Sequence, residues 1–124
     1  MNYQKPDKYN FFRHLGFALS GFKNMVKEEN AAKIHVAAFC ILSISLVFIP
    51  FSSISKIILF CSMFLVLIGE AINTAIERVV DLASPEYHEL AKQAKDIAAL
   101  VVLLSFVLTT IIWISTIMYE LNYF

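Results

Sequence analysis

The alternation of apolar and polar positions predicts a helix near the start of the chain. Between residues 9 and 28, apolar side chains recur at intervals of three and four, with Arg13, Lys23 and Lys27 placed among them. The apolar positions are Phe12, Leu15, Leu19, Phe22, Met25 and Val26. This pattern is typical of an amphipathic helix lying at a membrane surface, and a helix packed on a soluble partner is the alternative.

Three longer apolar runs follow. Residues 34–50 contain no Asp, Glu, Lys or Arg, and the residues just before them can extend the run to the length of a membrane span. Pro50 and the serines after it predict a short turn. The second run is purely apolar only in its first part, and the third extends from Ile97 to about Met118. We expect an all-α membrane protein with an amphipathic surface helix at about 9–28 and three transmembrane helices at about 31–50, 54–82 and 92–119.

Composition supports this class of protein. The chain has 124 residues, of which 59% are hydrophobic and 16% charged, with a mean hydropathy of +0.70. A soluble domain of this size could not bury so much apolar surface, so we expect a single membrane domain. The formal net charge is zero, which gives no indication of a nucleic-acid partner. Cys40 and Cys61 lie in apolar runs without metal-site spacing, and the polar N-terminal segment lacks a signal-peptide core.

The distribution of Lys and Arg predicts the orientation in the membrane. Residues up to Lys33 hold six of them, and the connection 78–96 holds three. The turn after the first span has only Lys56, and the segment after the third span has none. By the positive-inside rule, the N-terminus and the 78–96 connection are cytoplasmic, and the C-terminus lies outside the cell (plasma or inner) membrane.

Acidic residues follow one face of the second span. Glu70, Asn73, Glu77 and Asp81 are spaced three, four and four residues apart, which places them along one side of a helix. Glu70 and Glu77 are then about 10 Å apart along the axis. An acid within the membrane costs about 2.5–3.5 kcal/mol even on lenient scales, so Glu70 is a candidate functional residue. Its alternative role is to pair with a Lys of a neighbouring helix.

Two further segments bring charged groups to the same side. Glu28 and Glu29 stand where the surface helix meets the first span, and carboxylates from separate helices make an oxygen-rich site suited to Mg²⁺. A solvated pair of acids is the alternative reading. Ser84 and Pro85 predict a helix that starts with Ser84 as N-cap and carries Lys92, Lys95 and Asp96 toward the third span, where Lys95 could contact phosphate.

Other chemistries lack their motifs. The three glycines form neither a GxxxxGK nor a GxGxxG pattern, so a bound nucleotide must be held by helix side chains and metal. No Glu-x-x-His sequence occurs, which argues against a di-iron helical bundle.

Together these segments resemble the prokaryotic diacylglycerol kinase family, which includes the undecaprenol kinases. The resemblance rests on E-x-I-N-T-A-I-E-x-V-V-D at 70–81, S-P-E-Y-H-x-L-A-K-x-A-K-D at 84–96 and G-F-K-x-x-x-K-E-E at 21–29, and it covers nearly the whole chain. It implies a surface helix with three transmembrane helices, a homotrimer with shared active sites, and ATP-dependent phosphorylation of a lipid alcohol at the cytoplasmic interface.

The resemblance also implies residue roles. Glu70 is the general base, Asn73 orients the reacting groups, and Glu29 and Glu77 bind Mg²⁺. The remaining ATP-binding positions are Glu86, His88, Lys95, Asp96 and Gly21, the last as a close-packing position. A partly desolvated Glu70 would be a better proton acceptor near neutral pH, and phosphoryl transfer depends chiefly on positioning and charge neutralisation.

The acceptor lipid stays open between undecaprenol and diacylglycerol. The diacylglycerol branch of the family carries an Arg where this chain aligns Asn10, with Arg13 one turn further on, and a Glu where it has His35. The segments around 27–35 and 72–82 resemble the undecaprenol branch more closely. From other classes of protein, a proton-coupled transporter using Glu70 and a non-enzymatic membrane scaffold are the alternatives.

Overall fold

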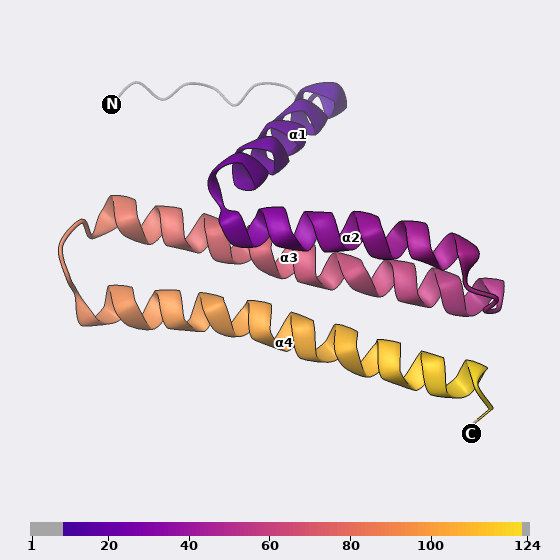
Figure 1. The fold of residues 1–124 in the computed structure, drawn as a ribbon. Coiled ribbons are helices and arrows are strands. Elements are labelled where there is room, and N and C mark those ends of the chain that lie inside the picture. Colours follow the sequence, from indigo (N-terminus) through magenta and orange to yellow (C-terminus); the bar gives the residue numbers. More distant parts are fainter. Residues whose placement is uncertain (1–8, 123–124) are drawn as a thin grey trace.

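The structure is a computed structural model that describes residues 9–122, and it is built of helices alone within that range. In chain order the helices are α1 (Phe11–Glu28), α2 (Asn30–Phe48), α3 (Ser53–Ala83) and α4 (Glu89–Glu120). The last three lie side by side along one direction, and α1 is inclined to them (Figure 1). By length and composition, these three are also apolar enough to cross a membrane. The all-α membrane fold expected from the sequence is therefore confirmed.

Helix α1 is capped by its own sequence and leaves its apolar face uncovered. The Asn10 side chain accepts a hydrogen bond of 3.3 Å from the backbone N–H of Arg13. Within α1, whose residues are all described, only Met25 is buried. Phe12, at 81% exposure, and its apolar neighbours are not covered by the other described residues, as suits a helix at a membrane surface. Glu29, in extended conformation, separates α1 from α2.

Helix α3 is the central element. Its buried residues recur every three or four positions: Ser55, Leu59, Ser62, Met63, Val66, Gly69, Glu70 and Thr74. A Cβ added to Gly69 would lie 2.8 Å from Ser105 Oγ of α4, so the absence of a side chain permits the close approach of these helices. Thr109 Oγ1 also donates a hydrogen bond of 3.1 Å to the Ser62 carbonyl.

The apolar core lies toward the turn between α2 and α3. Leu46, Leu59 and Met63 are buried there. Phe39, Ile49, Phe51 and Trp113 pack against them. The turn is fastened to the end of α4, since Glu120 Oε1 accepts hydrogen bonds from Ser52 N–H at 3.1 Å and from Ser52 Oγ at 2.7 Å.

The connection between α3 and α4 corrects one prediction. Ser84 does not cap a new helix. Instead its N–H bonds to the Val80 carbonyl, and Ser84 itself forms the C-cap of α3. A proline disfavours helical geometry for the residue before it, here Ser84. Pro85 therefore helps to end α3 rather than to start α4. The N-cap of α4 is His88, whose Nδ1 accepts a hydrogen bond from the N–H of Leu90 at 3.1 Å.

Differences in length expose one end of the bundle. With 31 and 32 residues, α3 and α4 are each about 46–48 Å long, whereas α2 has 19 residues and is about 28 Å long. His35, near the start of α2, lies opposite Glu70. The last turns of α3 and the first turns of α4 therefore extend beyond α2 (Figure 1).

Candidate functional site

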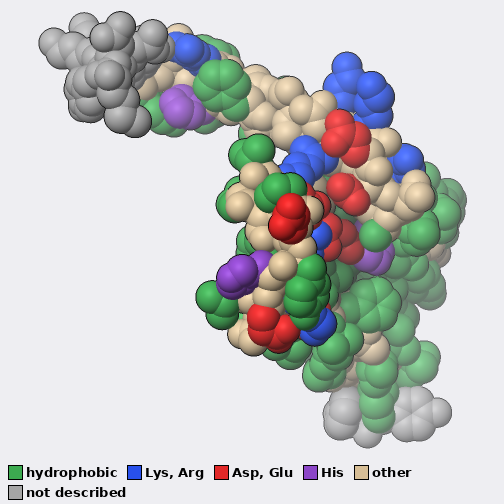
Figure 2. Space-filling model, turned by 90° about the vertical axis from the view of Figure 1, so that its left-hand side faces the viewer, with side chains coloured by type: hydrophobic (Ala, Val, Ile, Leu, Met, Phe, Trp, Pro, Cys, Tyr) green, Lys and Arg blue, Asp and Glu red, His purple; other side chains and the backbone are tan. Residues whose placement is uncertain are grey.

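Charged side chains gather where α3 passes into α4. We call this region, residues 70–96 together with 28–35, the α3–α4 end. Figure 2 looks onto it and shows Asp, Glu, Lys, Arg and His side chains on this face, with hydrophobic side chains along the body behind them. The distribution matches helices whose middle lies in hydrocarbon and whose ends reach water.

Glu70 is buried at the inner limit of this region. It is 4% exposed, and its Oε1 lies 2.9 Å from Nδ1 of His35 on α2. The Nδ1–H direction does not point at a hydrogen-bond acceptor, so the contact is a close polar approach rather than an aligned hydrogen bond. Rotation of the ring about χ2, a soft torsion, can align it. The partner expected for Glu70 as a purely structural residue was a lysine, and the structure places a histidine there.

The other polar residues of this face become more exposed along α3. Asn73 and Glu77 are half-buried, and Asp81 is exposed. Asn73 Oδ1 is buried and has no hydrogen-bond partner among the described residues. An unsatisfied buried acceptor costs free energy, which is offset where a ligand supplies the missing donor. The exposure gradient expected from the spacing is thus present.

Arg78 fastens the α1–α2 junction to α3. Its guanidinium lies 2.9 Å from the Glu28 carboxylate and 4.0 Å from the Glu29 carboxylate. Glu77 is the residue before Arg78, so the two predicted metal ligands belong to elements that Arg78 joins. Within residues 9–122, no group of three or more His, Cys, Asp or Glu side chains is arranged to hold a metal ion. A site of two carboxylates, completed by water and phosphate oxygens, still agrees with the way proteins bind Mg²⁺.

A cavity of about 340 Å³ opens beside the α3–α4 connection. Four of the predicted ATP-binding residues line it: Glu86, His88, Lys95 and Asp96. They come from the connection and from the first two turns of α4. The structure therefore brings these four together, whereas Glu29, Glu77 and Gly21 lie outside this lining.

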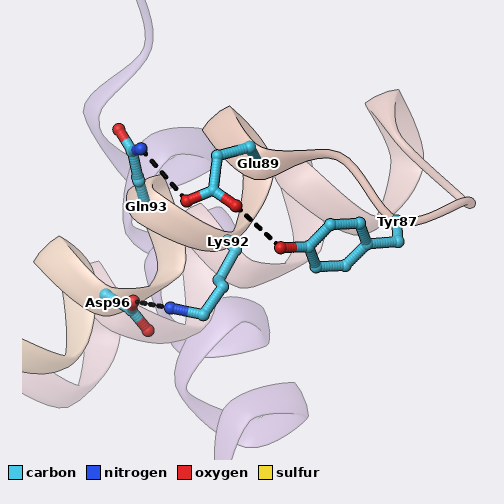
Figure 3. A network of polar contacts seen from close by, with 5 residues as sticks. All are labelled: Tyr87, Glu89, Lys92, Gln93 and Asp96. Carbon is cyan, nitrogen blue, oxygen red and sulfur yellow. Dashed lines mark hydrogen bonds and ion pairs between the residues drawn. The ribbon is translucent and has the colours of Figure 1, made fainter.

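Polar contacts hold the rim of this cavity (Figure 3). Tyr87 Oη donates to one oxygen of Glu89 at 2.7 Å, and Gln93 Nε2 donates to the other at 3.2 Å. The hydrogen bond to the Glu89 carboxylate raises the pKa of the Tyr87 phenol above its ordinary value. Tyr87 therefore stays a hydrogen-bond donor across the neutral range.

Two of the predicted ATP-binding residues, Lys95 and Asp96, each form an ion pair. Lys95 Nζ forms an ion pair with Asp81 Oδ1 across the α3–α4 gap, and Lys92 Nζ lies 2.7 Å from Asp96 Oδ2. Both pairs are at least one-third exposed, so their stabilising effect is small and the side chains can exchange partners with an incoming phosphate.

Two features of the site have only faint signals in the sequence. His35 stands out merely as a difference between family branches, because contact with Glu70 depends on how α2 and α3 are aligned. Arg78 lies within the motif at 70–81, but Glu28, with which it pairs, is fifty positions earlier in the sequence. Spacing within the motif therefore does not reveal this contact. For Gly21, an added Cβ would meet no atom within 4 Å in the single chain, so its close packing stays a prediction.

The fold and the site define a small membrane protein whose acidic and basic side chains from several helices meet at one end of a three-span bundle. The model of the prokaryotic diacylglycerol kinase family matches residues 16–117. The chain belongs to this family and is a lipid kinase.

Individual relatives agree over most of their length. The chain is 36% identical over 118 residues to a Helicobacter pylori diacylglycerol kinase, covering 90% of this chain and 91% of that protein. It is 32% identical over 98 residues to an Escherichia coli diacylglycerol kinase, covering 79% and 80%. It is also 36% identical over 89 residues to a Bacillus subtilis undecaprenol kinase, covering 72% of each. These relatives give no support to a transporter.

Proposed function

We propose that this protein transfers the γ-phosphate of ATP to the hydroxyl of a membrane lipid alcohol at the cytoplasmic boundary of the membrane. The observation that carries the proposal is the placement of buried Glu70 on the same end of the bundle as the cavity lined by Lys95 and Asp96. A proton acceptor at the edge of the apolar region and a charged cavity in water are what transfer from a soluble nucleotide to a lipid requires.

The nucleotide is bound at the α3–α4 connection. Lys95 meets phosphate oxygens as a point charge and leaves Asp81 to do so. Glu86, His88 and Asp96 contact the remainder of ATP from the same cavity. Gly21 of α1 lies outside the lining of this cavity, and its role as a close-packing position beside the nucleotide stays a prediction. The polar rim around Glu89 keeps the start of α4 ordered before the nucleotide arrives.

Glu29 and Glu77 hold Mg²⁺. Arg78 draws the first of them toward α3 and leaves the carboxylate half-buried rather than enclosed, which suits an ion that retains water and phosphate ligands. Bound there, Mg²⁺ would offset negative charge on the phosphates during transfer.

Glu70 acts as the general base that accepts the proton of the lipid hydroxyl, and Asn73 orients the reacting groups. The unpartnered Asn73 Oδ1 leaves one buried acceptor free for a hydroxyl donor. In the reaction, the lipid oxygen forms a bond to the γ-phosphorus, the bond from that phosphorus to the bridging oxygen breaks, and ADP leaves with the electron pair. The proton of the hydroxyl passes to the Glu70 carboxylate, which afterwards releases it to water.

Both lipids named by the relatives are candidate acceptors, and we favour undecaprenol. The reasons are the His35 and Asn10 positions, at which the chain differs from the diacylglycerol branch. Asn10 caps α1 instead of supplying a cation there. Diacylglycerol is the alternative acceptor of the same chemistry.

We propose that the protein lies in the cell membrane with its α3–α4 end and its N-terminus in the cytoplasm. Its C-terminus then lies on the outer side. We also propose a homotrimer. The apolar surfaces of α2 and α4 are largely uncovered within the chain, with Leu103 and Leu104 each 58% exposed. Neighbouring subunits would cover part of them and complete the open site.

The direct test incubates purified protein with γ-labelled ATP and Mg²⁺, and with undecaprenol or diacylglycerol in separate vesicles. We expect labelled lipid, more of it with undecaprenol. Labelling of neither lipid would contradict the kinase proposal, and greater labelling of diacylglycerol would contradict only the choice of acceptor.

A further inference from the structure

Lys92 lines the cavity beside the α3–α4 connection together with Lys95. The family resemblance implies ATP binding by Lys95 and assigns no role to Lys92. Lys92 Nζ lies 2.7 Å from Asp96 Oδ2, and the two side chains are 55% and 62% exposed. Figure 3 shows the Lys92 side chain extending to Asp96 on the next turn of α4. The ammonium group therefore belongs to the cavity proposed to bind ATP, and burial does not hold it in place.

The stability of α4 does not explain a lysine at this position. Lys92 is the fourth residue of α4, which begins at Glu89. A helix macrodipole favours anions at this end and cations at the other. The order of the pair with Asp96 is also the less favourable one, because an acid N-terminal to a base is the better arrangement at this spacing. A residue that goes against local helix preferences is expected to serve a site.

The charges that line the cavity give Lys92 a task. The lining has three carboxylates and two lysine ammonium groups: Asp81, Glu86 and Asp96 against Lys92 and Lys95. Each ammonium group pairs with one of these carboxylates. The phosphate chain of a nucleotide is anionic, and it meets less repulsion from the acids when both ammonium groups turn toward it. Without Lys92, one ammonium group would stand against three carboxylates.

The positions of the two lysines along α4 distinguish the phosphates they meet. Lys92 precedes Lys95 by about 4.5 Å along the helix axis, and residues three apart are neighbours on one face. Helix α4 runs from the connection back along α3, where Ser105 lies against Gly69. Lys95 is thus one step nearer to buried Glu70. Since the γ-phosphate must approach Glu70 for transfer, the phosphates beside Lys92 are those that remain in ADP.

We propose that Lys92 is a further ATP-binding residue, which leaves Asp96 to contact the α- and β-phosphates of the nucleotide. This inference rests on the proposed kinase function and deepens it, because it names a group that holds the departing ADP. Lys95 meets the end of the phosphate chain that is transferred. The departure of Lys92 frees the Asp96 carboxylate to accept a hydrogen bond from the nucleotide. The contact is electrostatic, so no bond forms or breaks at Lys92 and no proton moves there.

Substitution of Lys92 should weaken the binding of ATP and ADP equally. We expect Lys92→Ala to raise the KM for ATP and the inhibition constant of ADP each by about 5-fold, with kcat changed less than about twofold, since the reacting phosphate is not touched. Lys92→Arg keeps the charge and should remain near the wild-type values. Lys33→Ala is the matched control, because Lys33 is likewise the fourth residue of its helix at this end but does not line the cavity.

Chemical labelling of the wild-type protein locates the contact without reference to activity. Acetic anhydride acetylates lysine side chains, and mass spectrometry measures the rate at each position. With MgADP bound, acetylation of Lys92 should slow severalfold, because its ammonium group is held by phosphate. Acetylation of Lys33 should not change. This comparison needs no variant and is therefore independent of the folding of Lys92→Ala, which circular dichroism checks separately.

Three results would overturn the inference. Lys92→Ala could keep the wild-type KM for ATP, or lose kcat without a change in KM. Lys92→Arg could be as impaired as Lys92→Ala. MgADP could leave the acetylation of Lys92 as fast as before while slowing that of Lys95. Failure of the proposed function gives a different result, since the wild-type protein would then form no labelled lipid and MgADP would protect neither lysine.

Discussion

The two ends of the helical bundle hold their carboxylates in different ways. At the α2–α3 turn, Glu120 accepts two hydrogen bonds from Ser52, while Trp113 Nε1 nearby is buried without a hydrogen-bond partner among the described residues. At the α3–α4 end, Asn73 Oδ1 has no hydrogen-bond partner within residues 9–122, and ion pairs link separate helices.

This difference separates Glu120, a structural carboxylate, from Glu70, the carboxylate for which we propose a function. Glu120, at the end of α4, accepts its hydrogen bonds from Ser52 of the α2–α3 turn, so it needs no ligand. Glu70 is buried, and the charged partner that the described residues offer it is a histidine that is itself poorly aligned. A buried carboxylate in that condition is costly to the fold, which agrees with the functional role proposed for it.

Substitution of Glu70 should reduce the rate of lipid phosphorylation more than any other change considered below. We expect Glu70→Gln to lower kcat by about 100-fold or more, because the amide cannot accept the proton of the lipid hydroxyl. The KM for ATP should change little, since the nucleotide cavity does not include this residue. Initial rates with labelled ATP measure both. Glu120→Gln is the matched control at the other end and should keep full kcat; equal losses in the two variants would abolish the distinction between the ends.

The metal carboxylates should give the next largest effect. We expect Glu77→Gln to raise the Mg²⁺ concentration needed for half-maximal activity by roughly 10-fold or more, with partial recovery at high Mg²⁺. Titration of activity with Mg²⁺ measures it. Glu28→Gln removes an acid whose partner is Arg78 and should leave the requirement nearly unchanged. The assignment of Glu77 fails if both variants respond alike.

Lys95 should affect nucleotide binding more than turnover. We expect Lys95→Ala to raise the KM for ATP by about 10-fold, in line with loss of one charge-assisted hydrogen bond. Lys56→Ala, at the α2–α3 end, removes the same charge far from the cavity and should leave that KM unchanged. A KM that stays constant in Lys95→Ala would mean that Lys95 serves only its pair with Asp81.

The smallest expected effect concerns stability alone. Gly69→Val places side-chain atoms where even a Cβ would lie 2.8 Å from Ser105 Oγ, so we expect it to lower the free energy of unfolding by about 1–3 kcal/mol. Gly16→Ala meets nothing within 4 Å and should be neutral or slightly stabilising through helix propensity. Thermal unfolding in detergent compares them, and equal Tm values would show that α3 and α4 do not depend on this close approach.

The spacing of apolar residues was sufficient to predict that there are four helices, because each helix is identifiable from its own segment of the sequence. The exception is the start of α4. The prediction took Ser84 and Pro85 as the first residues of this helix, whereas α4 begins at Glu89. The same two residues can end a helix, and the sequence alone does not decide whether the Ser84 N–H stays bonded to Val80. His88, the residue that caps α4, is a less common capping type.

The site was partly predictable for a similar reason. Glu70, Asn73 and Glu77 share one helix, so their common face follows from spacing. Glu86 and Lys95 lie within one short segment and meet in one cavity. The contact of His35 with Glu70 depends on the alignment of two antiparallel helices, and a shift of a single turn would remove it. The catalytic, metal-binding and ATP-binding roles of these residues, and those of Glu29 and Gly21, all stay predictions.

Hydrogen–deuterium exchange of the wild-type protein with and without Mg²⁺ and a non-hydrolysable ATP analogue tests the contrast between the ends most directly. The account predicts slower amide exchange over residues 84–96 when the analogue is present, with residues 49–56 unchanged. Protection of the α2–α3 turn, or of neither end, would contradict it.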